Sequence, residues 1–290
     1  MVQLPETVVT LRAAIGDWPR RIGVPPGGRV LLMMDVTRLA WLFRKAGDRF
    51  DPKEFIDLFL RALGPEGTLV IPTFNYDLRN GERYDVLRTP TISGALGESA
   101  LAHPAFKRTA NPLHSFAVAG KLQDLFLAAK DPSSFGDRSP FALLKERSFQ
   151  LVAIDMPLGP AFTYVHFVEQ RMRVRYRTER CLQLEYTDGN GAAATRKFEL
   201  YAKRAGYVND FKELGSLLRQ KKILKEGELD GSTWLSIDLS QAHGIIEDDI
   251  KHNRARSIVK FKLRWWLRDV LRPFIIRARP SRSAISLQRQ

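Results

Sequence analysis

The chain lacks several features that would assign its class at once. It has one cysteine in 290 residues, which excludes an intramolecular disulfide and a zinc site built from cysteines. It has no run of about 18 uninterrupted apolar residues, so no transmembrane helix is expected. Residues 1–18 include acidic side chains and lack the basic-then-apolar layout of a secretion signal. These absences predict a cytoplasmic protein in a reducing compartment.

Positive charge is in excess, but only at one end of the chain. The formal net charge is +14, yet residues 251–290 hold twelve Lys or Arg and one acid, Asp269, which is +11. Residues 1–250 hold the other 34 basic and 31 acidic residues, or +3, so no basic nucleic-acid-binding body and no nucleic-acid partner are expected. With 44% apolar residues the chain is globular. We predict one domain over 1–250 and a basic, Trp-containing tail over 251–290.

Apolar runs of strand length alternate with stretches of helical pattern. Residues 29–36 and 67–74 are continuous apolar runs, typical of strands covered on both faces. Between them Asp51-Pro52 is an N-cap followed by proline at the first helical position, which predicts a helix and a parallel strand pair. Further strands are expected at 115–119, 149–154 and 233–239. Further helices are expected at 94–103, 121–130, 140–147, 162–171, 209–220 and 240–252.

A turn signal divides the second half of the chain. Residues 188–191, Asp-Gly-Asn-Gly, separate the alternating stretches 181–186 and 195–201, which indicates an antiparallel hairpin. Cys181 lies in the first stretch, and its strand placement favours packing over covalent catalysis. The predicted fold class is therefore α/β: a layered mixed sheet flanked by helices, with an antiparallel hairpin.

Five segments, in this order, resemble the antibiotic acetyltransferase family, which is typified by aminoglycoside 3-N-acetyltransferases. They are GPEGTLVIPTF (64–74), YDVLRTPTISGALGE (84–98), NPLHSF (111–116), FGDRSPF (135–141) and TYVHFVE (163–169). The resemblance implies a CoA-dependent N-acyltransferase of mixed α/β fold, distinct from the common GNAT acetyltransferases. Acetyl-CoA or another acyl-CoA would be its co-substrate.

The segment after the first strand departs from the family pattern. Family members carry a VHSSL-type segment there, whose backbone and hydroxyls meet the CoA pyrophosphate, whereas this chain has MMDVT at 33–37. We expect CoA to bind here through the backbone amides of 35–37, the Thr37 hydroxyl and the Arg38 charge. Ser139-Pro140 resembles a helix start and also borders the pantetheine channel of the family. The expected cofactor-binding residues are Asp35, Val36, Thr37, Arg38, Thr73, Ser115, Ser139 and Phe141.

Two of the family motifs hold the residue types that acyl transfer needs. Transfer from a thioester to an amine requires a base for the ammonium and stabilisation of the oxyanion. An imidazole held by a carboxylate suits the first task, because its ordinary pKa is about 6.5. His166 is spaced i,i+3 from Glu169, so the two lie on one helix face. We predict His166 as the catalytic base, with Glu169 or Asp77 as its catalytic carboxylate. The alternative is that His166 is a structural histidine, with its ring nitrogens hydrogen-bonded on a packed helix face.

The loops near these motifs supply the expected acceptor contacts. Asn75, Tyr76 and His114 are predicted to bind substrate, although Asn75 is also a favoured turn residue and His114 could cap its strand. The segment at 111–115 departs from the family's HPTHS at its first and third positions, Asn111 and Leu113, and retains His114 and Ser115. No histidine spacing suits a metal, so no metal site is predicted.

Three functions are consistent with these residues. The leading hypothesis is acyl transfer to an amino sugar, nucleotide-linked or free, in polysaccharide biosynthesis. The second is aminoglycoside 3-N-acetylation in antibiotic resistance. The third is a non-catalytic family paralogue that acts as a binding protein, because the CoA segment is altered.

The tail has a composition of its own. Residues 259–279 combine tryptophans and aliphatic residues with seven cations, and Pro273 is expected to end a helix of about three turns. This is the composition of a helix that lies on the inner face of a membrane. A helix packed on the body and a homo-oligomer contact are the alternatives.

Overall fold

Three parallel strands form the centre of the structure. The computed structural model describes residues 6–275, with side chains described for 11–270. In it β6 (Gln150–Ile154), β1 (Arg29–Met34) and β2 (Thr68–Pro72) lie side by side in a seven-stranded sheet of order β10-β11-β6-β1-β2-β5-β4. The parallel pairing of β1 with β2 confirms the predicted β–α–β unit. The outer strands, all antiparallel to their neighbours, are β4 (Lys107–Arg108), β5 (Phe116–Gly120), β10 (Leu224–Leu229) and β11 (Ser232–Asp238).

Alternate residues of the central strands enter two separate apolar cores. Val30 and Leu32 of β1 pack in one core with Trp18 and Phe55, whereas Leu31 packs in the other. Since each large apolar side chain contributes roughly 1.5–3 kcal/mol when fully buried, covering both faces stabilises the sheet strongly. The continuous apolar runs in the sequence therefore reflect burial on both sides.

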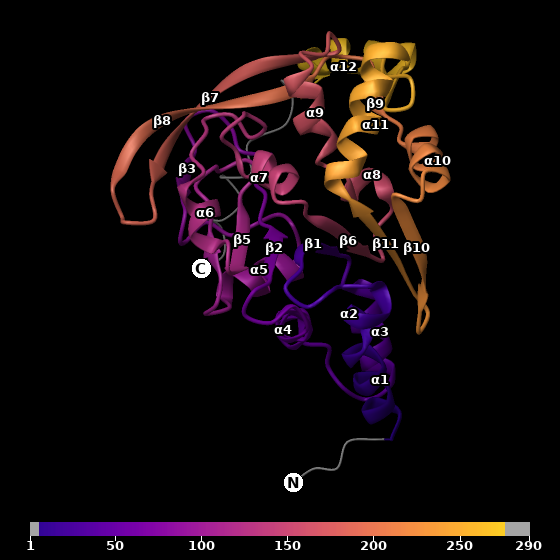
Figure 1. Cartoon of the computed structure of the whole chain (residues 1–290). Coiled ribbons are helices and arrows are strands. Elements are labelled where there is room, and N and C mark those ends of the chain that lie inside the picture. The colour runs from indigo at the N-terminus through magenta and orange to yellow at the C-terminus, as the bar shows by residue number, and fades with distance from the viewer. Residues whose placement is uncertain (1–5, 276–290) are drawn as a thin grey trace.

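Helices form a layer on each face of the sheet (Figure 1). Asp51 accepts a hydrogen bond from the Lys53 amide at 2.8 Å and Pro52 opens α4, as predicted. The first layer is α1 (Glu6–Gly16), α2 (Trp18–Ile22), α3 (Thr37–Lys45), α4 (Pro52–Leu63) and α5 (Ala95–Ala102). The second is α6 (Gln123–Ala128), α7 (Pro140–Glu146), α8 (Leu158–Ala161), α9 (Val165–Arg171), α10 (Lys212–Gln220) and α11 (Leu239–His252). The layered mixed sheet that the sequence predicts is confirmed.

The predicted hairpin is present and longer than expected. β7 (Arg177–Thr187) and β8 (Ala193–Lys203) pair along their whole length, and β3 (Arg83–Asp85) adds to β7 in parallel. Figure 1 shows this hairpin as a long arm beside the main sheet. Its base lies close to a small sheet formed by β9 (Tyr207–Asn209) and β12 (Val259–Phe261).

The last described element corrects one prediction. Helix α12 (Leu263–Ile275) continues through Pro273 instead of ending before it. Proline removes one hydrogen bond from a helix, but so close to the C-terminal end only the last turn is affected. Residues 276–279 of the predicted segment lie outside the described residues. Within residues 6–275, no helix is long and apolar enough to cross a membrane.

Candidate active site

An imidazole and a buried carboxylate meet on α9. The His166 Nδ1 lies 2.7 Å from the Glu169 Oε2, one helical turn along the same face. Glu169 is fully buried, while the His166 side chain retains 17% exposure. Because the carboxylate accepts from Nδ1, the other ring nitrogen, Nε2, carries the lone pair. This geometry suits an imidazole base that is oriented by a carboxylate.

Glu169 is held by more than the histidine. The Tyr176 hydroxyl donates to its Oε1 at 2.9 Å, and the Arg177 Nε lies 2.5 Å from its Oε2. Burial alone would raise the pKa of the Glu169 carboxyl, but His166, Arg177 and Tyr176 outweigh burial and hold it below its usual range. Glu169 is therefore ionised near neutral pH.

Arg177 also lies across the His166 ring. Its Nη2 is 2.8 Å from Nδ1 and 3.3 Å from Nε2, and its Nη1 donates to the Tyr201 carbonyl at 3.0 Å. Burial lowers the pKa of His166 and the Arg177 charge lowers it further, while Glu169 opposes both. The net effect is to lower the pKa of His166, so the imidazole is neutral near pH 7. Sequence reasoning missed Arg177 because it is one of several arginines at 171–180, and only burial distinguishes it.

His114 lies next to this pair in an aromatic enclosure. Its ring centroid is 4.8 Å from that of Phe135, which in turn is 5.8 Å from that of His166. Its Nδ1 bonds the Ser134 hydroxyl at 2.9 Å, and burial lowers its pKa to about 3. The exposed Tyr76 ring lies 6.3 Å away, so the structure brings together two of the predicted substrate residues.

The two predicted carboxylates are placed differently. Asp77 is exposed in the loop after β2 and is not among the charged groups that act on the pKa of His166. Glu169 is the carboxylate that pairs with the imidazole. A role for Asp77 toward substrate stays a prediction.

Three predicted residues belong to a network around a buried arginine. Arg108 donates to the Ser115 hydroxyl at 3.0 Å, to the Thr73 carbonyl at 2.8 Å and to the Asn75 Oδ1 at 2.8 Å. The Thr73 and Ser115 hydroxyls lie 3.0 Å apart. Their polar groups are satisfied within the protein, which indicates that this network shapes the loop carrying Tyr76.

A cavity of about 650 Å³ opens at the carboxyl ends of the parallel strands. Residues 33–37 and 93–97 line it, together with Phe74, Tyr76 and Thr163. The Thr163 carbonyl accepts from the His166 amide at 3.0 Å, so the cavity reaches the base of α9. The amino-terminal ends of α3 and α5 border it, and such ends favour anionic groups.

Two of the three amides expected to bind CoA are already engaged. The Asp35 amide donates to the Ile154 carbonyl at 3.0 Å, and the Thr37 amide donates to the Asp35 carboxylate at 2.9 Å. The hydrogen bonds from Thr37 lower the pKa of Asp35. The Asp35 and Thr37 amides are therefore engaged within the protein, at the start of α3, and a CoA-binding role for residues 35–37 stays a prediction.

The remaining predicted cofactor residues do not line this cavity. Ser139 is fully buried at the start of α7 and makes no side-chain cap, and Phe141 packs against Phe74 and Phe135 beside His114. Arg38 is exposed on α3, outside the cavity lining. Their roles toward a cofactor stay predictions.

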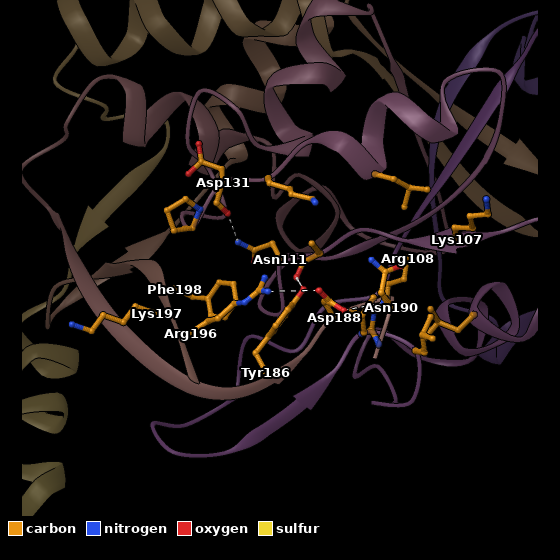
Figure 2. Close-up of a pocket in the computed structure, with 18 of the residues that line it drawn as sticks. Lys107, Arg108, Asn111, Asp131, Tyr186, Asp188, Asn190, Arg196, Lys197 and Phe198 are labelled. Carbon is orange, nitrogen blue, oxygen red and sulfur yellow. Dashed lines mark hydrogen bonds and ion pairs between the residues drawn. The ribbon is translucent and has the colours of Figure 1, made fainter. Parts of the chain in front are cut away.

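A second cavity of about 780 Å³ lies between the hairpin tip and the β4 edge of the main sheet (Figure 2). Asn111 points into it and donates to the Asp131 carbonyl at 3.4 Å, and Arg196 lies 3.6 Å from Asp188. His166 and Glu169 of α9 do not line it. Besides Arg196 and the two acids, its charged lining residues are the cations Lys107, Arg108, Lys130 and Lys197.

Comparison with known proteins agrees with this arrangement. The family model described as aminoglycoside 3-N-acetyltransferase matches residues 43–249, which is most of the chain and includes α9. The chain belongs to the aminoglycoside 3-N-acetyltransferase family. It is thus a CoA-dependent N-acetyltransferase, with acetyl-CoA as the co-substrate of the family. No curated protein matches it in sequence.

Several solved structures share the fold. AAC-IIIb in a binary complex with CoASH is 18% identical, with a TM-score of 0.69, over 83% of this chain and 96% of that one. A point mutant of AAC(3)-IVa in complex with apramycin is 21% identical, with a TM-score of 0.66, over 86% and 94%. YokD from Bacillus subtilis is 18% identical, with a TM-score of 0.69, over 88% and 97%.

Proposed function

We propose that His166 is the general base of an acetyl transfer from acetyl-CoA to the amino group of an amino sugar. The observation that carries this proposal is the short contact of Nδ1 with buried Glu169, which leaves Nε2 to accept a proton. Nε2 takes a proton from the acceptor ammonium and releases it to solvent, and the free amine attacks the thioester carbonyl. Nε2 then takes a second proton from the attacking nitrogen and gives it to the CoA thiolate as the carbon–sulfur bond breaks. Glu169 stabilises the imidazolium that forms.

The 650 Å³ cavity is the proposed CoA site. It is lined by apolar Met33, Ile71 and Phe74, which suit a pantetheine arm, and bordered by the starts of α3 and α5, which suit a pyrophosphate. The α5 start has Gly94 as its cap and no side-chain cap bond, so its first amides are open to an anion. The thioester is proposed to lie at the Thr163 end of the cavity, because the Thr163 carbonyl accepts from the His166 amide at 3.0 Å.

The charges around His166 indicate what net charge the acceptor carries. The charged side chains that act on the His166 pKa are Glu169, Arg177 and Lys203, one acid against two cations. A polycationic acceptor needs several acids near its amine. This balance favours an amino sugar with little further positive charge, including a nucleotide-linked one from polysaccharide biosynthesis. The second candidate acceptor is an aminoglycoside, which the family and its apramycin-bound and sisomicin-bound members favour.

Replacement of His166 tests the base. His166→Ala is expected to lower kcat by at least 100-fold, because general base catalysis contributes about 10²–10⁴-fold, and to leave the fold intact. The assay follows CoA release with acetyl-CoA and a panel of nucleotide-linked amino sugars, free amino sugars and aminoglycosides. His252→Ala is the matched control, because His252 forms a similar contact with Asp248 on an exposed helix face. A His166→Ala enzyme with the wild-type kcat would rule out the assignment.

A further inference from the structure

We propose that α12 docks on the surface of an anionic lipid membrane. The proposal concerns a surface of the molecule that acetyl transfer does not use. It is independent of the acceptor assigned above.

One face of α12 is apolar and uncovered. Leu263, Leu267 and Val270 follow one another at i,i+4 and i+7, the spacing of a single helical stripe, and their exposed fractions are 62%, 47% and 41%. Trp266 flanks the stripe and is 38% exposed. Large apolar side chains at this exposure mark an interaction surface when they form a contiguous patch.

The side of α12 next to the stripe, with Trp266 and Asp269, fixes the helix to the body. The Gly206 amide donates to the Asp269 Oδ2 at 3.2 Å, and the Lys262 amide donates to the Gly206 carbonyl at 2.8 Å. A Cβ on Gly206, whose φ is +83°, would lie 2.6 Å from the Trp266 Cβ. This close contact between Gly206 and Trp266 holds α12 in one orientation, so the stripe faces away from the protein.

The charges beside the stripe identify its partner. Arg264 lies beside the stripe and Lys262 precedes α12. Arg268 lies further round the helix, where it pairs with Asp269, the one acid of the tail, which also accepts from the Gly206 amide. Two copies of this chain that met symmetrically through the stripe would bring these cations against one another. An anionic lipid surface attracts them instead, while the stripe and Trp266 enter the headgroup region.

The helix is suited to lie on a bilayer and not to cross it. Its 13 residues span about 20 Å, less than the roughly 30 Å of a hydrocarbon core. Strand β12, which leads into α12, pairs with β9, and the Asn209 Nδ2 of β9 lies 3.5 Å from the His166 Nε2. Docking would therefore hold the active site next to the membrane surface.

Vesicle co-sedimentation of the full chain tests the proposal. Vesicles of phosphatidylcholine with about one third phosphatidylglycerol are expected to pellet the protein at low salt, and pure phosphatidylcholine vesicles to pellet at least tenfold less. High salt should release it, because screening shortens the reach of the cations. Leu263→Glu with Leu267→Glu, and separately Lys262→Glu with Arg264→Glu, should each lower the partition coefficient about tenfold or more.

The matched controls lie elsewhere on the surface. Leu87→Glu changes an apolar side chain that is 71% exposed, and Arg44→Glu with Lys53→Glu reverses two exposed cations outside the tail. Both controls should pellet like the wild type, and acetyl transfer in solution should be unchanged in every variant. The proposal is overturned if the full chain stays in the supernatant with anionic vesicles at low salt. It is also overturned if α12 variants bind vesicles normally, or if light scattering shows a dimer that they dissociate without any vesicle binding.

Discussion

Arg177 places a cation against the imidazole that is proposed to receive a proton. A cation there opposes formation of the imidazolium, while Glu169 favours it, so the two neighbours of His166 act in opposite directions. The charged and titratable groups that face the ring are Glu169 from α9, Arg177 from β7, Lys203 from β8 and His114 from the loop before β5. Burial, with the Arg177 charge, outweighs Glu169 and lowers the pKa of His166, so the imidazole is neutral and able to accept a proton at physiological pH.

Variants of the two neighbours should move the pH dependence of kcat in opposite directions. Activity requires neutral His166, so the acidic limb of the profile follows its pKa. Arg177→Met removes the cation, raises that pKa and shifts the limb to higher pH. Glu169→Gln removes the anion, lowers the pKa and shifts the limb to lower pH, with a loss of about 10-fold or more in kcat because the imidazolium is less stabilised.

Arg177→Lys is the control for this pair, since it retains the charge and loses the planar contact with the ring. The acidic limb of the kcat profile of Arg177→Lys should stay at the pH of the wild-type limb even if kcat itself falls. A merely structural Arg177 would lower kcat in Arg177→Met without moving the limb. That result would contradict electrostatic control of the base.

At the scale of elements, Asp35 connects the proposed CoA cavity with the start of α3. The departure from the family pattern at 33–37 places a carboxylate near the proposed pyrophosphate site, where its charge is unfavourable. The same carboxylate accepts from the Thr37 amide at 2.9 Å and so supports the first turn. Asp35 therefore has a structural role that offsets its electrostatic cost.

Two substitutions at Asp35 should separate these effects. Asp35→Ser keeps a capping oxygen and removes the charge, so CoA should bind about three- to tenfold more tightly with little change in Tm. Asp35→Ala removes both and should lower the free energy of unfolding by about 1 kcal/mol. Calorimetric titration with CoA and thermal unfolding measure the two quantities. Weaker CoA binding by Asp35→Ser would show that the carboxylate itself contributes to the site.

The elements that sequence could predict are those whose signal is local. The runs that form β1 and β2, the cap at Asp51 and the spacing of His166 and Glu169 on α9 are each contained within about a dozen residues. Helix α3 was missed because its buried face is only Leu39 and Phe43 among several cations. Strands of two or three residues, such as β4 and β9, are too short to show a period.

The rest of the site depends on contacts between distant segments. Arg177 lies at the start of β7, and it contacts His166 only because of the direction in which β7 leaves the turn after α9. Asn209 contacts the same imidazole from β9. Arg108 lies on an edge strand. It donates hydrogen bonds to three residues, Thr73, Asn75 and Ser115, that the sequence analysis predicted to bind cofactor or substrate. Such partners follow from tertiary packing, which no local pattern encodes.

At the scale of the whole molecule, the enzyme buries neutral histidines in its interior. His114 bonds Ser134 inside an aromatic enclosure, and burial lowers its pKa to about 3. His243 bonds the Tyr164 hydroxyl at 2.9 Å, and burial lowers its pKa to about 4. Both are near 6.5 in an unfolded chain, so between these values the unfolded state binds more protons than the folded state.

The free energy of unfolding should therefore fall as the pH drops below about 6.5. Each histidine contributes stability that is present above its unfolded pKa and is lost as the pH falls toward its folded pKa. For His114 the loss between pH 6.5 and 4.5 is roughly 2–3 kcal/mol, at about 1.4 kcal/mol per pH unit. Carboxylates also titrate in this range, so the wild-type curve alone does not isolate the histidine.

Urea unfolding of His114→Asn at pH 7 and pH 4.5 isolates it. The variant loses packing and is expected to be less stable than the wild type at pH 7, but it should lose roughly 2–3 kcal/mol less on acidification, because asparagine has no proton to gain. His252→Asn is the control for the same substitution at an exposed histidine. Parallel curves for His114→Asn and the wild type would show that His114 is not the group whose protonation opposes folding.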